Sequence, residues 1–139
     1  MRFAITGTDA RFLALRQLLP ADGHEITDPA AADFVIPPPW DPSARYARRE
    51  EYQIANARLT AEGAAALLRP ETGLSGAHVL ILGYGRIGRL LAREMQKAGS
   101  LVTCAARNAA QRAWAQEEGF EALPLDALSA ALGGFDVLV

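Results

Sequence analysis

A glycine-rich motif directly after an apolar run constrains this chain more than any other feature. Residues 77–82 read Ala-His-Val-Leu-Ile-Leu, and glycines at 83, 85 and 88 then give the pattern G-x-G-x-x-G before a helical pattern begins. A continuous apolar run of this length is typical of a strand buried on both faces of a parallel sheet. A bare glycine triplet would be weak evidence, but its place between a strand and a helix predicts a dinucleotide-binding unit.

Each glycine of this motif has its own expected role. Gly83 permits a tight turn, Gly85 lets the backbone approach a pyrophosphate, and Gly88 lets the helix pack against its strand. The start of the helix then presents N–H groups and the positive end of its dipole to the phosphates. Arg86 lies inside the loop, and we expect its guanidinium to reach a phosphate. The predicted cofactor-binding residues of the loop are Gly83, Tyr84, Gly85, Arg86, Ile87 and Gly88.

The end of the next predicted strand, residues 101–105, decides which nicotinamide cofactor we expect. An Asp or Glu about 20 residues after the glycines binds the ribose 2′-hydroxyl of NAD, whereas an Arg accommodates the 2′-phosphate of NADP. Here residues 105–108 read Ala-Ala-Arg-Asn, with no acid. The planar guanidinium of Arg107 can chelate a phosphate that a carboxylate would repel. The sequence therefore favours NADP, while NAD stays open if Arg107 only caps the sheet edge.

The fold class that we predict is α/β, in two units joined by a helix. Short strands at 2–6, 24–27 and 33–36 and a helix at 9–19, followed by Pro20, give a small parallel α/β N-terminal unit over residues 1–58. A strand at 53–59 is a further expectation. Residues 59–75 form a connecting helix, capped by Thr60 and ended at Pro70, and a linker.

Residues 76–139 are expected to form the first half of a Rossmann-type doubly wound dinucleotide-binding domain, incomplete at the C-terminus. Its helix after the glycines buries Ile87, Leu91 and Met95, with Arg89 and Arg93 solvated, and the next helix, 109–118, turns Trp114 inward. The strand at 135–139 would lie at a sheet edge with an apolar surface uncovered. We expect the chain to be a fragment of a longer protein. Cover by another copy, as in a homo-oligomer, is the alternative.

Composition bounds the partners and the compartment. The net charge of −2 gives no electrostatic footprint for nucleic acid, and no apolar run is long enough to cross a membrane. The single cysteine, Cys104, is expected to be a small hydrophobic residue in the core. The two histidines, His24 and His78, have no cluster of ligands around them, so we expect no metal site. We expect a cytoplasmic protein.

Several segments resemble the A subunit of dipicolinate synthase. They are residues 7–11 (Gly-Thr-Asp-Ala-Arg), 56–64 (Asn-Ala-Arg-Leu-Thr-Ala-Glu-Gly-Ala), 76–91 with the glycine loop, and 105–107 (Ala-Ala-Arg). The resemblance implies a sporulation enzyme that oxidises a dihydrodipicolinate-type precursor to pyridine-2,6-dicarboxylate with a nicotinamide cofactor. It also implies a cleft between the two units for the reaction, with a second, flavoprotein-like subunit for a partner. The N-terminal unit is shorter than that of the family.

The resemblance implies a small dicarboxylate heterocycle as substrate, and such a dianion needs cationic or N–H donors. We expect Arg11 to clamp it, with Asp9 and Glu62 in orienting roles. Asp9 as a helix N-cap and Glu62 as a residue that favours the helix dipole are the structural alternatives. No catalytic residue is assigned.

Two other functions compete with this one. A regulatory nucleotide-binding module of the kind that gates potassium transport has a similar glycine loop but usually carries an acid where this chain has Ala106. A relative of the 2-hydroxyacid dehydrogenases would need its catalytic Arg and His beyond Val139.

Overall fold

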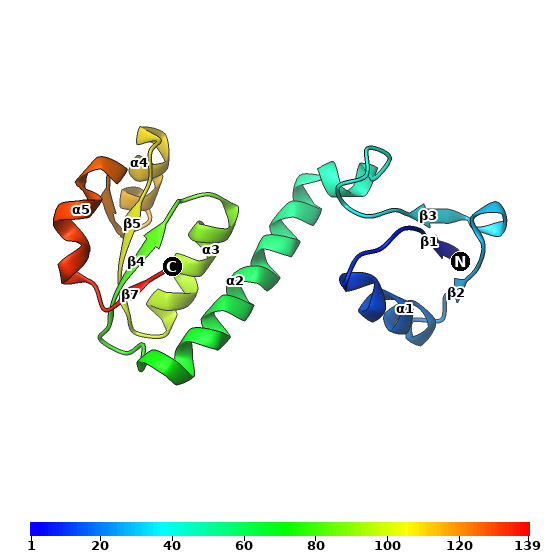
Figure 1. The fold of residues 1–139 in the computed structure, drawn as a ribbon, viewed down its shortest axis with the longest axis horizontal. Helices are drawn as coiled ribbons and strands as arrows, with labels where there is room; N and C mark the ends of the chain where they lie inside the picture. Colours follow the sequence, from blue (N-terminus) through cyan, green and yellow to red (C-terminus); the bar gives the residue numbers. More distant parts are fainter. The chain divides into compact units, whose positions relative to one another are not determined.

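The computed structural model divides the chain into two compact units, residues 1–52 and 53–139. It describes residues 1–69 and 73–139. Each unit has its own parallel sheet, and Figure 1 shows the elements of both.

The N-terminal unit is a small parallel α/β layer, as predicted. Its strands are β1 (Arg2–Ile5), β2 (Glu25–Ile26) and β3 (Phe34–Ile36), in the sheet order β2-β1-β3. Helix α1 (Arg11–Ala21) connects β1 to β2. Two 3₁₀ turns, η1 (Pro29–Ala31) and η2 (Arg45–Arg48), flank β3. Strand β1 pairs in parallel with both β2 and β3. Parallel neighbours need crossover connections, which carry the chain back to the same end of the sheet before the next strand begins.

Helix α1 ends later than predicted. Pro20 lies inside the helix, which continues to Ala21, so the expectation that Pro20 follows the end is wrong. A proline in the last turn removes only one donor. Residues that follow the helix donate hydrogen bonds to its last carbonyls. The Leu19 carbonyl accepts the N–H of His24, and the Pro20 carbonyl accepts the N–H of Gly23.

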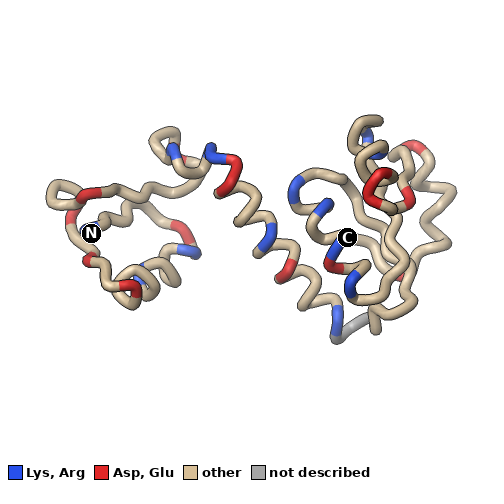
Figure 2. Tube along the Cα trace, turned by 180° about the vertical axis from the view of Figure 1, so that it is seen from behind, with Lys and Arg blue, Asp and Glu red and all other residues tan. Residues whose placement is uncertain are grey.

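Helix α2 (Glu50–Thr72) replaces the predicted strand at 53–59, and this prediction is wrong. Among the residues of α2 whose burial is described, the small Ala57, Ala61 and Ala65 are buried, spaced four apart on one helix face, whereas Leu59 is exposed. Charges of both signs follow one another along the helix (Figure 2).

Two further expectations about α2 are corrected. Thr60 is no cap, because it lies in mid-helix and its Oγ1 donates to the Asn56 carbonyl at 2.9 Å. The acids of the first turn are Glu50 and Glu51, so Glu62 is not there to favour the dipole. The predicted helix end at Pro70 falls on residues 70–72, outside the described part.

The second unit contains the first half of a doubly wound fold, which confirms the predicted fold class. Strands β4 (His78–Leu82), β5 (Leu101–Ala105), β6 (Glu121–Leu123) and β7 (Val137–Leu138) are parallel in the order β6-β5-β4-β7. The helices are α3 (Arg86–Lys97), α4 (Ala109–Glu117) and the short α5 (Leu128–Ala131), which is flanked by the 3₁₀ turns η3 (Leu125–Ala127) and η4 (Leu132–Gly134). Register pairs Leu82 with Ala105, so β4 and β5 end level with each other.

The core of this unit gathers on β4, whose central residues Val79, Leu80 and Ile81 are fully buried. Cys104 is also buried, which confirms its expected place. Two predictions of burial are wrong. Ile87 is 45% exposed, and Trp114 is 57% exposed.

Other residues of α3 and α4 are buried in place of Ile87 and Trp114. Ala115 is the residue of α4 that is buried, and α3 buries Leu91, Ala92 and Met95 instead of Ile87. Within the part of the chain that the structure describes, no helix is long and apolar enough to span a bilayer.

Candidate functional site

The loop between β4 and α3 has the geometry of a nucleotide-binding turn. Gly83 has φ of +101°, which L side chains rarely adopt, and its N–H donates to the carbonyl of Ala105 at 2.7 Å. A Cβ at position 88 would overlap the backbone carbonyl of Gly83. Two of the three glycines are therefore required by the protein itself, one for its dihedral and one for close packing.

Gly85 is required by neither constraint. Its φ is −88°, and a Cβ built there would meet nothing within 4 Å. Across residues 1–69 and 73–139, no partner is found for the backbone N–H groups of Tyr84, Gly85, Ile87 and Gly88. Unpaired N–H groups at a helix N-terminus beside open space form an anion site. The loop therefore fits the pyrophosphate of a dinucleotide.

The side chains of the loop are placed differently from one another. Arg86 is the first residue of α3 and is exposed, and Ile87 is half-exposed beside it. Tyr84 is only 4% exposed, with its ring packed edge-on to Phe120 at 6.2 Å. Its side chain therefore faces the protein interior, and what Tyr84 offers a ligand is its backbone.

Beneath the loop, Glu118 forms ion pairs with two arginines that were expected to be solvated. Arg93 donates to Glu118 Oε2 from Nε at 3.1 Å and from Nη2 at 2.8 Å, and Arg89 pairs with Oε1. The Arg89 guanidinium also lies 5.4 Å from the centre of the Trp114 ring. The expectation of free solvation is wrong for both arginines.

Protonation follows from this arrangement. Burial opposes ionisation of Glu118, but hydrogen bonds from Arg89 and Arg93 outweigh it and hold its pKa below the ordinary value. Burial, and after it the nearby Glu118 carboxylate, raise the pKa of Tyr84. The carboxylate therefore stays charged at neutral pH and ties α3 to the end of α4.

The tip of β5 carries Arg107 where the sequence predicted it, exposed to solvent. Asn108 caps α4, because its Oδ1 accepts the N–H of Ala110 at 2.8 Å. Arg112, which the sequence reasoning missed, reaches back from the first turn of α4 and donates from Nη1 to the carbonyls of Ala106 and Arg107, both at 2.8 Å. An arginine one turn into the helix after such a tip is a signal that sequence inspection could have used.

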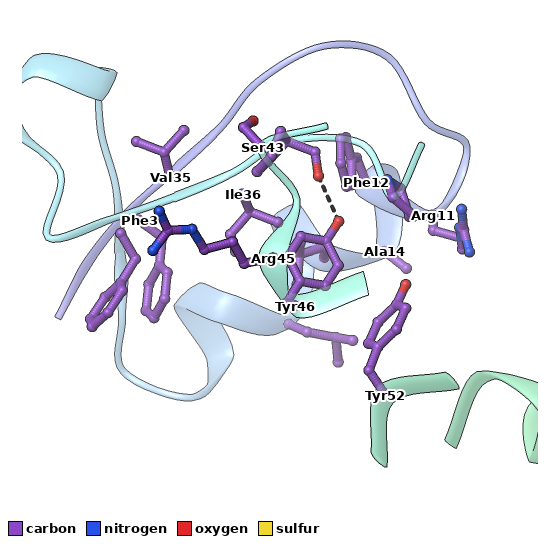
Figure 3. A pocket seen from close by; sticks show the side chains of 15 residues that line it. Phe3, Arg11, Phe12, Ala14, Val35, Ile36, Ser43, Arg45, Tyr46 and Tyr52 are labelled. Carbon is purple, nitrogen blue, oxygen red and sulfur yellow. Dashed lines mark hydrogen bonds between the residues drawn. The ribbon is translucent and has the colours of Figure 1, made fainter. Parts of the chain in front are cut away.

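The N-terminal unit holds a cavity of about 640 Å³ between α1, β3 and η2 (Figure 3). Its walls are mainly apolar and aromatic, and Phe3 and Phe34 stack at 5.6 Å. Tyr46 contacts Tyr52 edge-on at 5.0 Å and donates to the Pro37 carbonyl at 2.5 Å. The polar lining includes Arg11, Arg45 and Ser43. A cavity of this size and composition suits a small organic ligand. The sequence reasoning did not find it, although aromatic residues flanking the triple proline were a signal.

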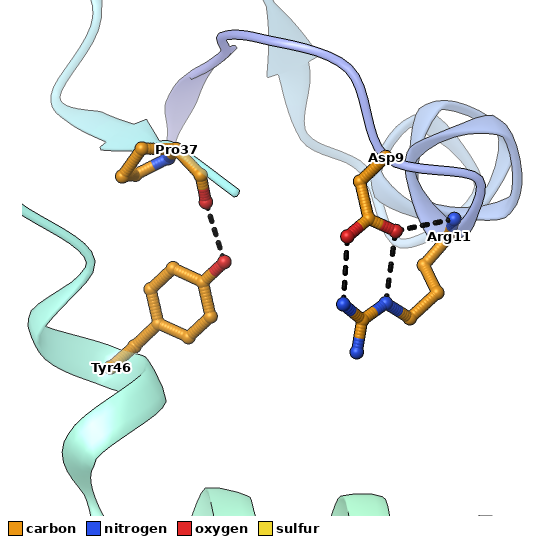
Figure 4. A network of polar contacts seen from close by, with 4 residues as sticks. All are labelled: Asp9, Arg11, Pro37 and Tyr46. Carbon is orange, nitrogen blue, oxygen red and sulfur yellow. Dashed lines mark hydrogen bonds and ion pairs between the residues drawn. The ribbon is translucent and has the colours of Figure 1, made fainter. Parts of the chain in front are cut away.

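Asp9 and Arg11 are brought together (Figure 4). Glu62 belongs to the other unit and is exposed on α2. Arg11 donates to Asp9 from Nε at 2.9 Å and from Nη2 at 2.7 Å, and its backbone N–H reaches Oδ1 at 2.8 Å. The Asp9 side chain is 4% exposed. The hydrogen bonds from Arg11 hold the pKa of Asp9 below its ordinary value. Asp9 thus stabilises the start of α1, and Arg11 presents to a ligand a charge that Asp9 already compensates.

No group of three or more His, Cys, Asp or Glu side chains suited to a metal ion occurs in the described ranges.

Residues 44–137 match the family model described as "D-isomer specific 2-hydroxyacid dehydrogenase, NAD binding domain". A shorter segment of 51 residues is 47% identical to UDP-N-acetylmuramoylalanine--D-glutamate ligase of Roseobacter denitrificans, covering 37% of this chain and 11% of that protein.

Two solved structures resemble nearly the whole chain. The A subunit of dipicolinate synthase from Bacillus halodurans aligns with a TM-score of 0.64 at 23% identity, over 98% of this chain and 41% of that one. The corresponding dipicolinate synthase polypeptide of Bacillus subtilis gives 0.63 and 22%, over 98% and 40%. The likeness is one of fold, and the chain spans about two fifths of the length of either structure.

Proposed function

The chain belongs to the family of the NAD-binding domain of D-isomer specific 2-hydroxyacid dehydrogenases, and on that premise we propose that its glycine loop holds a nicotinamide dinucleotide for an oxidoreductase. The observation that carries this proposal is the open space above Gly85, next to the N–H groups of Ile87 and Gly88, which have no partner among the described residues. The bound dinucleotide supplies hydride transfer. The residues of this chain bind the pyrophosphate and orient the cofactor.

The cofactor is NADP rather than NAD. Arg107 stands exposed at the end of β5, and neither Ala106 nor Asn108 supplies the acid that would hold a 2′-hydroxyl. A guanidinium at this position attracts the 2′-phosphate that distinguishes NADP.

The reaction is oxidation of a dihydrodipicolinate-type precursor to dipicolinate, in spore formation. The fold likeness to the A subunit of dipicolinate synthase over 98% of the chain supports this choice. Oxidation of such a precursor removes one hydride and one proton from the heterocycle and makes the ring aromatic, which supplies driving force. A bound NADP⁺ would accept the hydride.

The substrate dianion binds in the N-terminal unit, where Arg11 and Arg45 line one aromatic cavity. Asp9 orients Arg11 through two side-chain hydrogen bonds. For Glu62 we propose only a role in orienting the substrate. The partners are a further copy of the chain and a second, flavoprotein-like subunit. The compartment is the cytoplasm.

A second candidate is favoured by the family match itself, namely oxidation of a D-2-hydroxy acid to the 2-oxo acid. In that oxidation the carbon that bears the hydroxyl would lose a hydride to the bound nicotinamide, and the hydroxyl proton would go to a base. The two candidates differ in substrate and share the cofactor site.

Fluorescence titration of the 139-residue chain with NADPH and NADH tests the cofactor claim. We expect saturable binding of both, tighter for NADPH, and absence of binding by either would refute the proposal. Formation of reduced cofactor with a dihydrodipicolinate-type substrate, against a panel of D-2-hydroxy acids, then separates the two reactions.

A further inference from the structure

The backbone at the tip of β5 is held by a side chain from the next helix. Nη1 of Arg112 donates to the carbonyl oxygens of Ala106 and Arg107, both at 2.8 Å. Carbonyl oxygens carry partial negative charge and repel a phosphate at close range. The positive charge of the Arg112 guanidinium, which lies against both carbonyls, offsets this repulsion.

The same guanidinium keeps further donors. It carries five N–H groups in a rigid plane, of which Nη1 supplies two. For Nε and Nη2 of Arg112, no partner is found in the described ranges of the chain. The side chain is half-buried, so the fork is held near the tip while its outer edge remains available.

The sequence from the end of β5 through most of α4 carries positive charge. Residues 105–116 include Arg107 and Arg112 and no Asp or Glu. Asn108 fixes the start of α4 through its bond to the N–H of Ala110, so the two arginines stand on one ordered turn. We propose that Arg112 is a second specificity-determining residue for NADP, donating to the 2′-phosphate beside Arg107. This inference rests on the proposed binding of a nicotinamide dinucleotide.

The competing explanation is that Arg112 only stabilises the turn. A structural role would weaken NADPH and NADH binding alike, whereas contact with the 2′-phosphate weakens NADPH alone. The ratio of the two dissociation constants within one protein sample therefore separates the explanations, and partial misfolding does not alter it.

We would measure dissociation constants for NADPH and NADH by fluorescence in the full chain and in Arg112→Ala and Arg112→Gln. The glutamine variant would keep a polar side chain with an N–H donor and lose the charge. Arg58→Ala is the matched control, because Arg58 is an exposed arginine on α2 of the same unit and its loss changes the net charge equally.

We expect both Arg112 variants to bind NADPH about tenfold more weakly, with NADH affinity changed less than about twofold, since a charge-assisted hydrogen bond is lost. The Arg58 variant should keep the parent ratio. An unchanged ratio in the Arg112 variants, or an equal loss for both cofactors, overturns the inference and leaves the proposed function standing. A parent chain that prefers NADH, or that binds neither nucleotide, overturns the inference together with the cofactor proposal.

Discussion

Gly88 lies so close to Gly83 that a single methyl group on its Cα would overlap the carbonyl oxygen at the start of the loop. The neighbouring Gly85 has no such contact, although it belongs to the same motif. If the proposed function holds, Gly88 serves folding and Gly85 serves binding, and the two requirements can be separated experimentally.

Substitution Gly88→Ala should lower the free energy of unfolding by about 1–3 kcal/mol, because the clashing atom is backbone and cannot turn aside. Gly85→Ala should change it by less than about 1 kcal/mol, since φ is negative there and the space is open. Denaturant titration measures both. Equal destabilisation by the two variants would contradict this account.

The same Gly85→Ala variant should bind NADPH and NADH more weakly by about tenfold or more, because its methyl group occupies the space that the pyrophosphate needs. The loss should be the same for both cofactors, since the pyrophosphate is common to them. Fluorescence titration of the folded variant measures it, and undiminished affinity would show that no ligand approaches Gly85 closely.

Substitution Arg107→Ala should weaken NADPH binding by about tenfold while leaving NADH binding nearly unchanged, because only NADPH carries the 2′-phosphate. The ratio of the two dissociation constants is the measurement, with Arg58→Ala again as control. A variant that retains the parent affinity for NADPH would count against NADP preference based on Arg107.

Stability should fall with decreasing pH because of Glu118. Its pKa is lowered in the folded state, so its contribution is fully present above the unfolded value of about 4.3 and is lost as pH falls through the folded value. Glu118→Gln should reduce stability at pH 7 by about 1–3 kcal/mol and flatten the acid limb of the stability curve. Thermal unfolding of both proteins between about pH 3 and pH 7 measures this, and parallel curves would contradict it.

The thiol of Cys104 should resist alkylation in the folded protein. Burial raises its pKa to about 12, and the side chain is 1% exposed, so neither the thiolate nor access is available at about pH 8. Mass spectrometry after iodoacetamide treatment should show slow modification in buffer and rapid modification in denaturant. Rapid labelling in buffer would mean that β5 opens readily.

The sequence was most informative where one residue type has one physical purpose. The glycines at 83 and 88 predicted the turn and the close packing, and the apolar run predicted β4, because backbone dihedrals and burial act locally. The two parallel units followed from strand and helix lengths.

The misses came from competition between residues distant in sequence. Trp114 belongs on a core face by hydrophobicity, yet Ala115 is buried and the tryptophan lies against the Arg89 guanidinium. The pairing of Glu118 with Arg89 and Arg93 spans α3 and α4, so no local pattern reveals it. The small buried alanines of α2 give a weak periodic signal, and residues 53–59, predicted as a strand, are part of this helix.

The hydrogen bond from the Gly83 N–H to the Ala105 carbonyl joins the turn that we propose for the pyrophosphate to the end of β5, which we propose for the ribose. Residues 106 and 107 directly follow the carbonyl that accepts this bond, so a change of coenzyme engineered there has to leave the Ala105 backbone in place. A successful redesign would preserve that bond first and exchange charges around it second.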